Sequence, residues 1–192
     1  MNKTIGDTKR RDFIKVMGLG ALASASTAFA KKSGRNKTII TLSQEEKDTL
    51  FYIFQEEKVA RDVYITLGKI YPQESTFANI QHSEQEHILS AQVLCERYGI
   101  DTSDVNLSLE DDFVGQFELD AMQTLYNNCI AAGQNTLIDA LYVGVDIERT
   151  DIDDLVDAAE GMPADVVQVY DNLKAGSLNH LAAFESAIQR TI

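Results

Sequence analysis

Carboxylate and imidazole side chains recur in this 192-residue chain at spacings suited to binding a metal ion. Glu84 and His87 are three residues apart, so on a helix both side chains share one face and can reach one cation. Glu148 and Asp151 repeat this spacing further along the chain. Mixed oxygen and nitrogen donors suit iron or manganese. The chemistry open to these residues is therefore that of a carboxylate-histidine metal site.

Two more polar residues interrupt the apolar stripes of the predicted helices. Glu57 lies seven residues after Leu50 and seven before Tyr64, so it falls on the buried face of its helix. His180 takes a similar place in the last helix. A buried carboxylate is costly unless a partner compensates it. Arg61, one turn beyond Glu57, offers an ordinary ion pair as the alternative to a metal.

Each of these residues alone has an ordinary structural explanation, because acidic helices usually face solvent. Together they place at least one carboxylate or imidazole on the inner stripe of all four long predicted helices. A bundle core does not need such polar groups, whereas a metal site built between facing helices does. The combination therefore favours metal binding over surface charge.

Helical periodicity dominates the chain from Ser43 onward, and no convincing strand-like alternation competes with it. Ser43 and Glu46 have the spacing of a capping box. We expect an all-α, ferritin-like four-helix bundle: two helical hairpins joined by a long crossover that carries a short extra helix. The expected helices span about 44–71, 76–98, 117–132, 136–159 (after an Asn135 cap) and 163–192, with Pro163 at the first helical position.

The first thirty residues have the organisation of an export signal. A charged region with Arg10 and Arg11 is followed by an uncharged stretch, 16–30, that ends in a small-residue cleavage pattern at Ala30. The arginine pair and its flanks resemble the twin-arginine signal, apart from Lys9, where Ser or Thr is usual. An ordinary secretory signal or an uncleaved anchor is the alternative. We expect a signal over 1–30, a flexible tail over 31–41 and the helical domain over 42–192, in a periplasmic or otherwise exported protein.

Charge and cysteine content argue against several other classes of protein. The net charge of −13 argues against nucleic acid, whose phosphates need a basic protein surface. Two cysteines cannot build a disulfide scaffold or a four-cysteine zinc site. We expect Cys95 and Cys129 to be buried free thiols, with a disulfide between them, which export would permit, as the alternative; His82 is expected to lie at the surface.

Several segments resemble known proteins. Residues 57–64, with the pattern Glu-x-x-Ala-Arg-x-x-Tyr, resemble the first helix of rubrerythrin-like ferritins, and Glu84-x-x-His87 resembles their second. More closely, about 42–188 resembles an uncharacterised ferritin-like family of bacteria and archaea, a domain of unknown function. The segments that carry this likeness are 56–64, 77–87, 144–155 and 170–181.

The resemblance implies a set of metal ligands and one departure from the usual pattern. A di-iron ferritin has Glu-x-x-His on its last helix, whereas this chain has Ser177-x-x-His180, so one carboxylate is missing. Asp151 could replace it. Two metals would then be held, most simply two iron ions, with manganese or a single ion as alternatives. The implied ligands are Glu57, Glu84, His87, Glu148 and His180, with Asp151 as the sixth.

The resemblance also implies a redox function. We expect an exported metal protein that reduces peroxide or oxidises ferrous iron, with O₂ or peroxide as the oxidant. An external electron donor is needed, because no rubredoxin-like four-cysteine module is present. No membrane contact is expected after signal cleavage. Related bundles often pair, so both a monomer and a homodimer stay open. The alternative is a non-catalytic binding or stress-response module with a structural metal or none, so whether the protein is an enzyme stays open.

Two further residues have expected roles beside the metal. Arg61 is expected to support the acidic cluster from outside the ligand set. Tyr64 lies about 10 Å along the helix from Glu57, so the two cannot share a metal, and Tyr64 is expected to be a core residue with a bonded hydroxyl.

Overall fold

The computed structural model describes residues 41–192. The predicted export signal over 1–30 and nearly all of the predicted tail over 31–41 lie outside the described residues. Within that part of the chain there are five α-helices and no strand, which confirms the all-α prediction. The helices are α2 (Gln44–Ile70), α3 (Ser75–Arg97), α4 (Asp120–Gly133), α5 (Leu137–Ala158) and α6 (Ala164–Thr191).

Local sequence signals account for most of the helix boundaries. Ser43 and Glu46 form the predicted capping box at the start of α2, with Glu46 N donating to Ser43 Oγ at 3.3 Å. Two predicted starts were wrong by one residue. Thr136, not Asn135, caps α5, because its hydroxyl accepts a hydrogen bond from the backbone of Asp139. Pro163 precedes α6 as its N-cap instead of occupying the first helical position.

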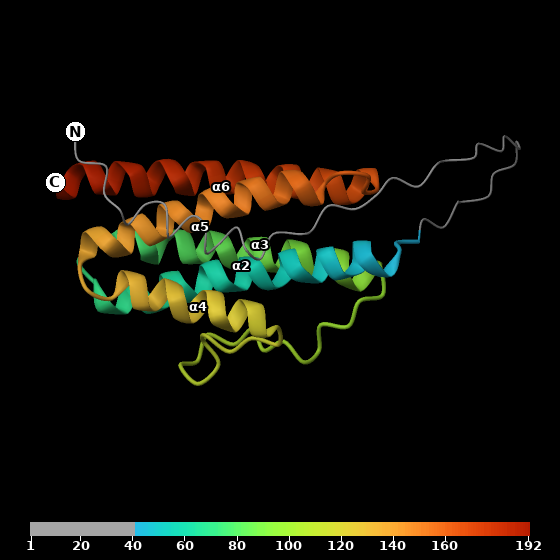
Figure 1. Cartoon of the computed structure of the whole chain (residues 1–192), viewed down its shortest axis with the longest axis horizontal. Coiled ribbons are helices and arrows are strands. Elements are labelled where there is room, and N and C mark those ends of the chain that lie inside the picture. Colours follow the sequence, from blue (N-terminus) through green and yellow to red (C-terminus); the bar gives the residue numbers. More distant parts are fainter. Residues whose placement is uncertain (1–40) are drawn as a thin grey trace, which may run out of the picture. The chain divides into compact units, whose positions relative to one another are not determined.

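The helices form a bundle of two hairpins. α2 packs along α3, and α5 packs along α6; the pairs then meet through α2 against α5 and α3 against α6 (Figure 1). The connection 98–119 and α4 lead the chain back along the bundle, so that α3 and α5 run in the same direction (Figure 1). The predicted crossover with a short extra helix is therefore present, although α4 begins at Asp120 and not near 117.

A buried ion network ties the crossover to α2. The Asp62 carboxylate accepts hydrogen bonds from Lys58 Nζ at 2.6 Å and from Arg61 NH2 at 2.7 Å, and all three side chains are fully buried. Asp62 also accepts from the backbone of Gly115. Lys58 and Arg61 donate in addition to the crossover carbonyls of Gln116 and Leu107 respectively. The network therefore satisfies backbone groups that would otherwise be buried without partners.

The apolar interior consists of two separate cores, one toward each end of the bundle. One core gathers residues such as Tyr64, Phe77 and Phe184. The other gathers residues such as Phe54 and Leu173. On each of the four long helices the predicted ligands lie between these two groups, at 57, 84–87, 148–151 and 180. We call this level of the bundle the polar layer. No helix among the described residues is long and apolar enough to span a membrane.

Candidate metal centre

The polar layer brings together all six residues that the sequence singled out. Each of the six side chains is buried, and they come from all four long helices: Glu57 from α2, Glu84 and His87 from α3, Glu148 and Asp151 from α5, and His180 from α6.

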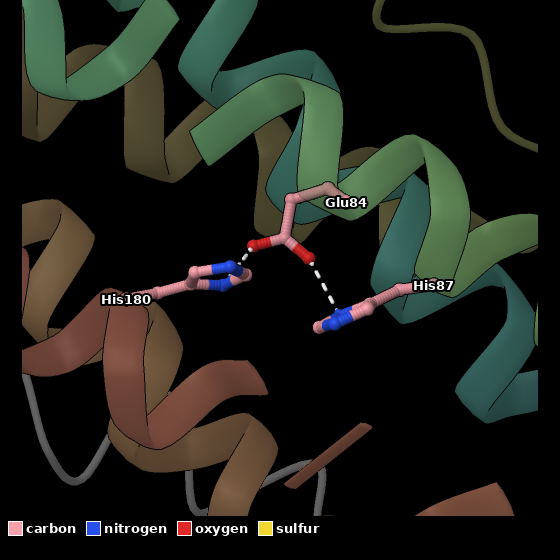
Figure 2. A group of neighbouring side chains, drawn as sticks. All are labelled: Glu84, His87 and His180. Carbon is pink, nitrogen blue, oxygen red and sulfur yellow. Dashed lines mark ion pairs between the residues drawn. The ribbon is translucent and has the colours of Figure 1, made fainter. Parts of the chain in front are cut away.

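Glu84 lies at the middle of the layer between the two histidines. Its Oε2 is 2.9 Å from Nδ1 of His87, and its Oε1 is 2.8 Å from Nδ1 of His180 (Figure 2). One ligand atom from each of the three residues lies within 4.8 Å of the other two. Two imidazoles and a carboxylate at this separation can bind one metal ion.

The remaining carboxylates extend this group on both sides. Glu57 Oε2 lies 3.1 Å from Nδ1 of His87. Glu148 Oε2 lies 3.5 Å from Nδ1 of His180, and its other oxygen accepts a hydrogen bond of 2.6 Å from the hydroxyl of Tyr64. Tyr64 therefore has the bonded hydroxyl that was predicted. Its partner is a carboxylate on a facing helix, which the spacing along α2 could not indicate.

Asp151 has a different environment. Its Oδ2 accepts a hydrogen bond of 2.5 Å from the hydroxyl of Ser177, the residue that stands where a di-iron pattern would have a glutamate. Ser177 itself is buried and also lies 3.0 Å from the carbonyl of Leu173. One oxygen of Asp151 is thus engaged by Ser177, and its Oδ1 has no hydrogen-bond partner.

Several polar atoms of the layer are buried without a hydrogen-bond partner. They include Oε1 of Glu57, Oε1 of Glu84, Oδ1 of Asp151 and Nδ1 of His180. Two of these atoms, Glu84 Oε1 and His180 Nδ1, are 2.8 Å apart but are not aligned for a hydrogen bond. A buried unsatisfied polar group costs about 1–3 kcal/mol. Buried oxygen and nitrogen atoms of the types that bind metals, left without hydrogen-bond partners, fit a cation.

The electrostatics of the cluster favour protons in the absence of an ion. Burial lowers the pKa of His87, but Glu57 and Glu84 outweigh that effect and raise it to about 11. His180 is raised to about 9 in the same way, against burial, by Glu148 and Glu84. Burial raises the pKa of Glu84, yet the two histidines lower it to about 2. Charged imidazoles therefore compensate Glu84 in the metal-free protein.

The other carboxylates are shifted in the opposite direction. Burial and the charge of Glu84 raise the pKa of Glu148 to about 8. Burial, followed by Glu57, raises the pKa of Asp151 well above its ordinary value, and burial likewise raises that of Glu57. These groups hold protons that a bound cation would displace.

Gly176 is a neighbour of the polar layer that the sequence did not single out. It lies on α6 beside the ring of His87, and a Cβ at this position would overlap Nε2 of that ring. Only glycine lets the backbone of α6 approach His87 so closely. The pattern Gly176-Ser177 was visible in the sequence, but nothing in it showed which ring from another helix would pack there.

Three expectations about neighbouring residues can be compared with the structure. Arg61 does not support the acidic cluster as predicted; it binds Asp62 and donates to Gln85 at 2.5 Å. The adjacent carboxylate and the crossover carbonyl outcompete the site for its guanidinium. His82 is exposed, as predicted. The two cysteines, Cys95 and Cys129, are buried free thiols, also as predicted.

Comparison with known proteins places these helices in a family. A family model described as an uncharacterized protein domain, DUF2202, matches residues 46–191. An uncharacterized protein of Methanocaldococcus jannaschii, MJ0754, is 37% identical over 146 residues, which span 74% of this chain and 75% of that protein. The crystal structure of the hypothetical protein MJ0754 matches with a TM-score of 0.70 at 34% identity, over 86% of this chain and 87% of that one. Neither description names an activity or a ligand.

Proposed function

The chain belongs to the DUF2202 family of uncharacterized protein domains, and on that premise we propose that it is a metal-binding, ferritin-like redox protein. The observation that carries the proposal is the buried cluster of Glu84, His87 and His180, whose ligand atoms lie within 4.8 Å of one another. A cluster of this chemistry in the middle of a bundle core is costly without an ion. The crossover between the hairpins supports the ferritin-like architecture.

The residues of the polar layer divide naturally into the ligands of two ions. Glu84, His87 and His180 would hold the first ion. Glu57, Glu148 and Asp151 would hold the second, since each carries a carboxylate in the layer and Glu57 and Asp151 each have an unpartnered oxygen. The metal would be iron, or manganese, because both accept mixed carboxylate and imidazole donors. Such an ion supplies one-electron chemistry toward O₂ or peroxide.

Residues around the polar layer would limit the access of water and orient the ligands. Both apolar cores exclude bulk water from the layer above and below it. The hydroxyl of Tyr64 fixes Glu148 by donating to one of its oxygens, which leaves the other oxygen directed toward His180. The reaction class is peroxide reduction or ferrous oxidation. The electrons would come from an external donor, because the described cysteines are buried thiols that make no four-cysteine cluster.

A second candidate is a single structural ion, or none, in a non-catalytic binding or stress-response module. The observation in its favour is the 2.5 Å hydrogen bond from Ser177 to Asp151, which engages an oxygen that a second ion would need. With that oxygen engaged, the first three ligands would suit one ion better than two. Export through a twin-arginine signal and pairing as a homodimer remain proposals that rest on the sequence alone.

Elemental analysis of the protein purified from its own host tests the proposal. H87Q and H180Q each remove one nitrogen ligand, and H82Q is a matched control at an exposed histidine. About two iron or manganese ions per chain in the wild type, lost in H87Q and H180Q but kept in H82Q, would support the two-ion centre. About one ion per chain would favour the single-ion module. An intact helical bundle without metal would overturn the redox proposal.

A further inference from the structure

Four acidic residues follow one another at three-residue spacing along α5: Glu148, Asp151, Asp154 and Asp157. Three residues of an α-helix rise about 4.5 Å and turn through about 300°, so each side chain lies about 60° around the helix from the one before. Burial follows this rotation. Glu148 and Asp151 are buried, Asp154 is half-buried and Asp157 is exposed. The series therefore leads from the polar layer to the surface.

Glu56 on α2 faces this acidic series. It is only 4% exposed, and its carboxyl group lies within hydrogen-bonding reach of Asp154. The charged groups that act most strongly on Glu56 are all acidic: Asp154, Asp151 and Glu57. Two buried carboxylates this close repel each other, and a cation between them would relieve that repulsion.

Two oxygens at this place have no hydrogen-bond partner. Oε2 of Glu56 and Oδ1 of Asp151 are both buried and unsatisfied. The second oxygen of Asp151 already accepts from Ser177, so Oδ1 is the one left for another ligand. A cation is a partner that both carboxylates could use, since each would otherwise bear its full desolvation cost.

We propose that Glu56 and Asp154 form an acidic entrance, through which a divalent cation passes from the surface by way of Asp151 to the cluster of Glu84, His87 and His180, called here the histidine cluster. This inference rests on the proposed function, because the passage leads to the proposed centre. The donors are all oxygens, which suit hard divalent ions such as Mn²⁺ or Fe²⁺ and hold them less tightly than a site with imidazoles. Because the imidazoles of the histidine cluster bind the ion more tightly, the ion moves from the oxygen ligands toward that cluster.

Rapid-mixing measurement of metal uptake tests the passage. The metal-free full-length chain is mixed with Co²⁺, and absorbance of the nitrogen-bound ion follows loading of the histidine cluster. We expect E56Q and D154N to slow loading about tenfold, because neutralising an acidic entrance lowers the encounter rate of a cation. The equilibrium affinity of the histidine cluster should stay within about twofold, since its nitrogen ligands are unchanged. D153N is the matched control at the neighbouring, exposed position of α5, and it should load like the wild type.

The outcomes separate this inference from the proposed function. Unchanged loading in both E56Q and D154N would overturn the passage while leaving the centre intact. If E56Q and D154N load Co²⁺ at the wild-type rate but release it faster, Glu56 and Asp154 are ligands of the centre itself. That result would also overturn the passage. Failure of the wild type to bind Co²⁺ through nitrogen would overturn the proposed function first.

A second measurement examines the acidic entrance in the absence of the centre's nitrogen ligands. Mn²⁺ binding is followed by electron paramagnetic resonance in H87Q/H180Q, where the nitrogen ligands are absent. We expect E56Q to remove about one weakly bound Mn²⁺ per chain, whereas an ion held by Glu57, Glu148 and Asp151 should remain. An unchanged number of bound Mn²⁺ ions after E56Q is added would overturn the acidic entrance. Circular dichroism on every variant shows that a loss of binding does not reflect unfolding.

Discussion

His87 and His180 come from different hairpins, yet their rings stack with centroids 5.3 Å apart and an interplanar angle of 29°. Glu84 offers one carboxylate oxygen to each ring. In the metal-free protein both rings are charged at neutral pH, since their pKa values are raised to about 11 and about 9. Two stacked imidazolium ions repel each other, and the neighbouring carboxylates Glu84, Glu57 and Glu148 oppose that repulsion. A metal ion would replace these protons and leave the side chains in place.

The stability of the metal-free protein should fall as pH rises. His180 and Glu148 have folded pKa values of about 9 and about 8, above their ordinary values of 6.5 and 4.5. Groups whose pKa is raised by folding stabilise the protein fully below the ordinary value, and this contribution is lost as pH rises through the folded value. We therefore expect the free energy of unfolding to decrease between pH 6.5 and 9.

With metal bound, the free energy of unfolding should instead increase with pH, because bound ions require deprotonated ligands and bind more tightly at higher pH. Urea unfolding with a chelator, and again with excess Mn²⁺, measures both cases. Metal-free stability that is constant or increases over this pH range would contradict the assignment of the protons to the polar layer.

Replacing Gly176 by alanine should weaken metal binding while leaving the helix intact. Alanine favours a helix by up to about 1 kcal/mol over glycine. Its Cβ would overlap Nε2 of His87, however, and must displace that ring. We expect an affinity at least about tenfold lower, equivalent to about 1.4 kcal/mol, measured by titration with Co²⁺.

The matched control is A175G at the exposed neighbouring residue, which should lose helix stability and keep the affinity. Equal affinity of G176A and wild type would show that His87 does not bind the ion from its observed position.

Removing the hydroxyl of Ser177 should release Asp151 for a second ion. S177A leaves Oδ2 of Asp151 without its donor, so the metal-free protein should lose about 1–3 kcal/mol. With Mn²⁺ present we expect the second equivalent to bind more tightly than in the wild type, as measured by calorimetric titration. S90A removes an exposed serine that makes the same type of bond to its own helix, and should change neither quantity. A weaker second equivalent in S177A would show that Ser177 positions Asp151 as a ligand.

Neutralising Asp62 should destabilise the protein strongly. D62N leaves Lys58 and Arg61 buried with a much weaker partner, and breaking a buried ion network costs about 3–5 kcal/mol. Asp111, which pairs with Lys69 at the surface, provides the comparison, because D111N should change stability by less than about 1 kcal/mol. Urea unfolding measures both. Limited proteolysis should also cut 98–119 faster in D62N; a loss of stability below 1 kcal/mol with unchanged proteolysis would contradict the anchoring role.

The periodicity of the sequence was sufficient to predict the helices and the level of the polar residues within them. Glu57 and His180 stood on apolar stripes, and the structure brings both into the polar layer. This succeeded because helical geometry relates residues of one element by fixed rotation. The ligand roles themselves, the ferritin-like assignment and the export route remain predictions.

Contacts between elements far apart in the sequence could not be predicted in the same way. The partner of Arg61 depended on how the crossover folds back, which presents the carbonyl of Leu107 to it. The approach of Gly176 to His87 and of Glu56 to Asp154 depends on the packing of separate helices. One signal was available for the last pair, since Asp154 and Asp157 continue the three-residue spacing of Glu148 and Asp151.

The polar layer also has a mechanical consequence. Because it separates the two apolar cores, the hairpins are held together at the middle of the bundle by charged groups instead of close-packed side chains. An ion bound there by residues of both hairpins would act as a cross-link at the midpoint, joining segments distant in the chain and restricting their sliding. Loading the ion would then couple the two hairpins more tightly, so that the central amides exchange with solvent only when the whole bundle opens.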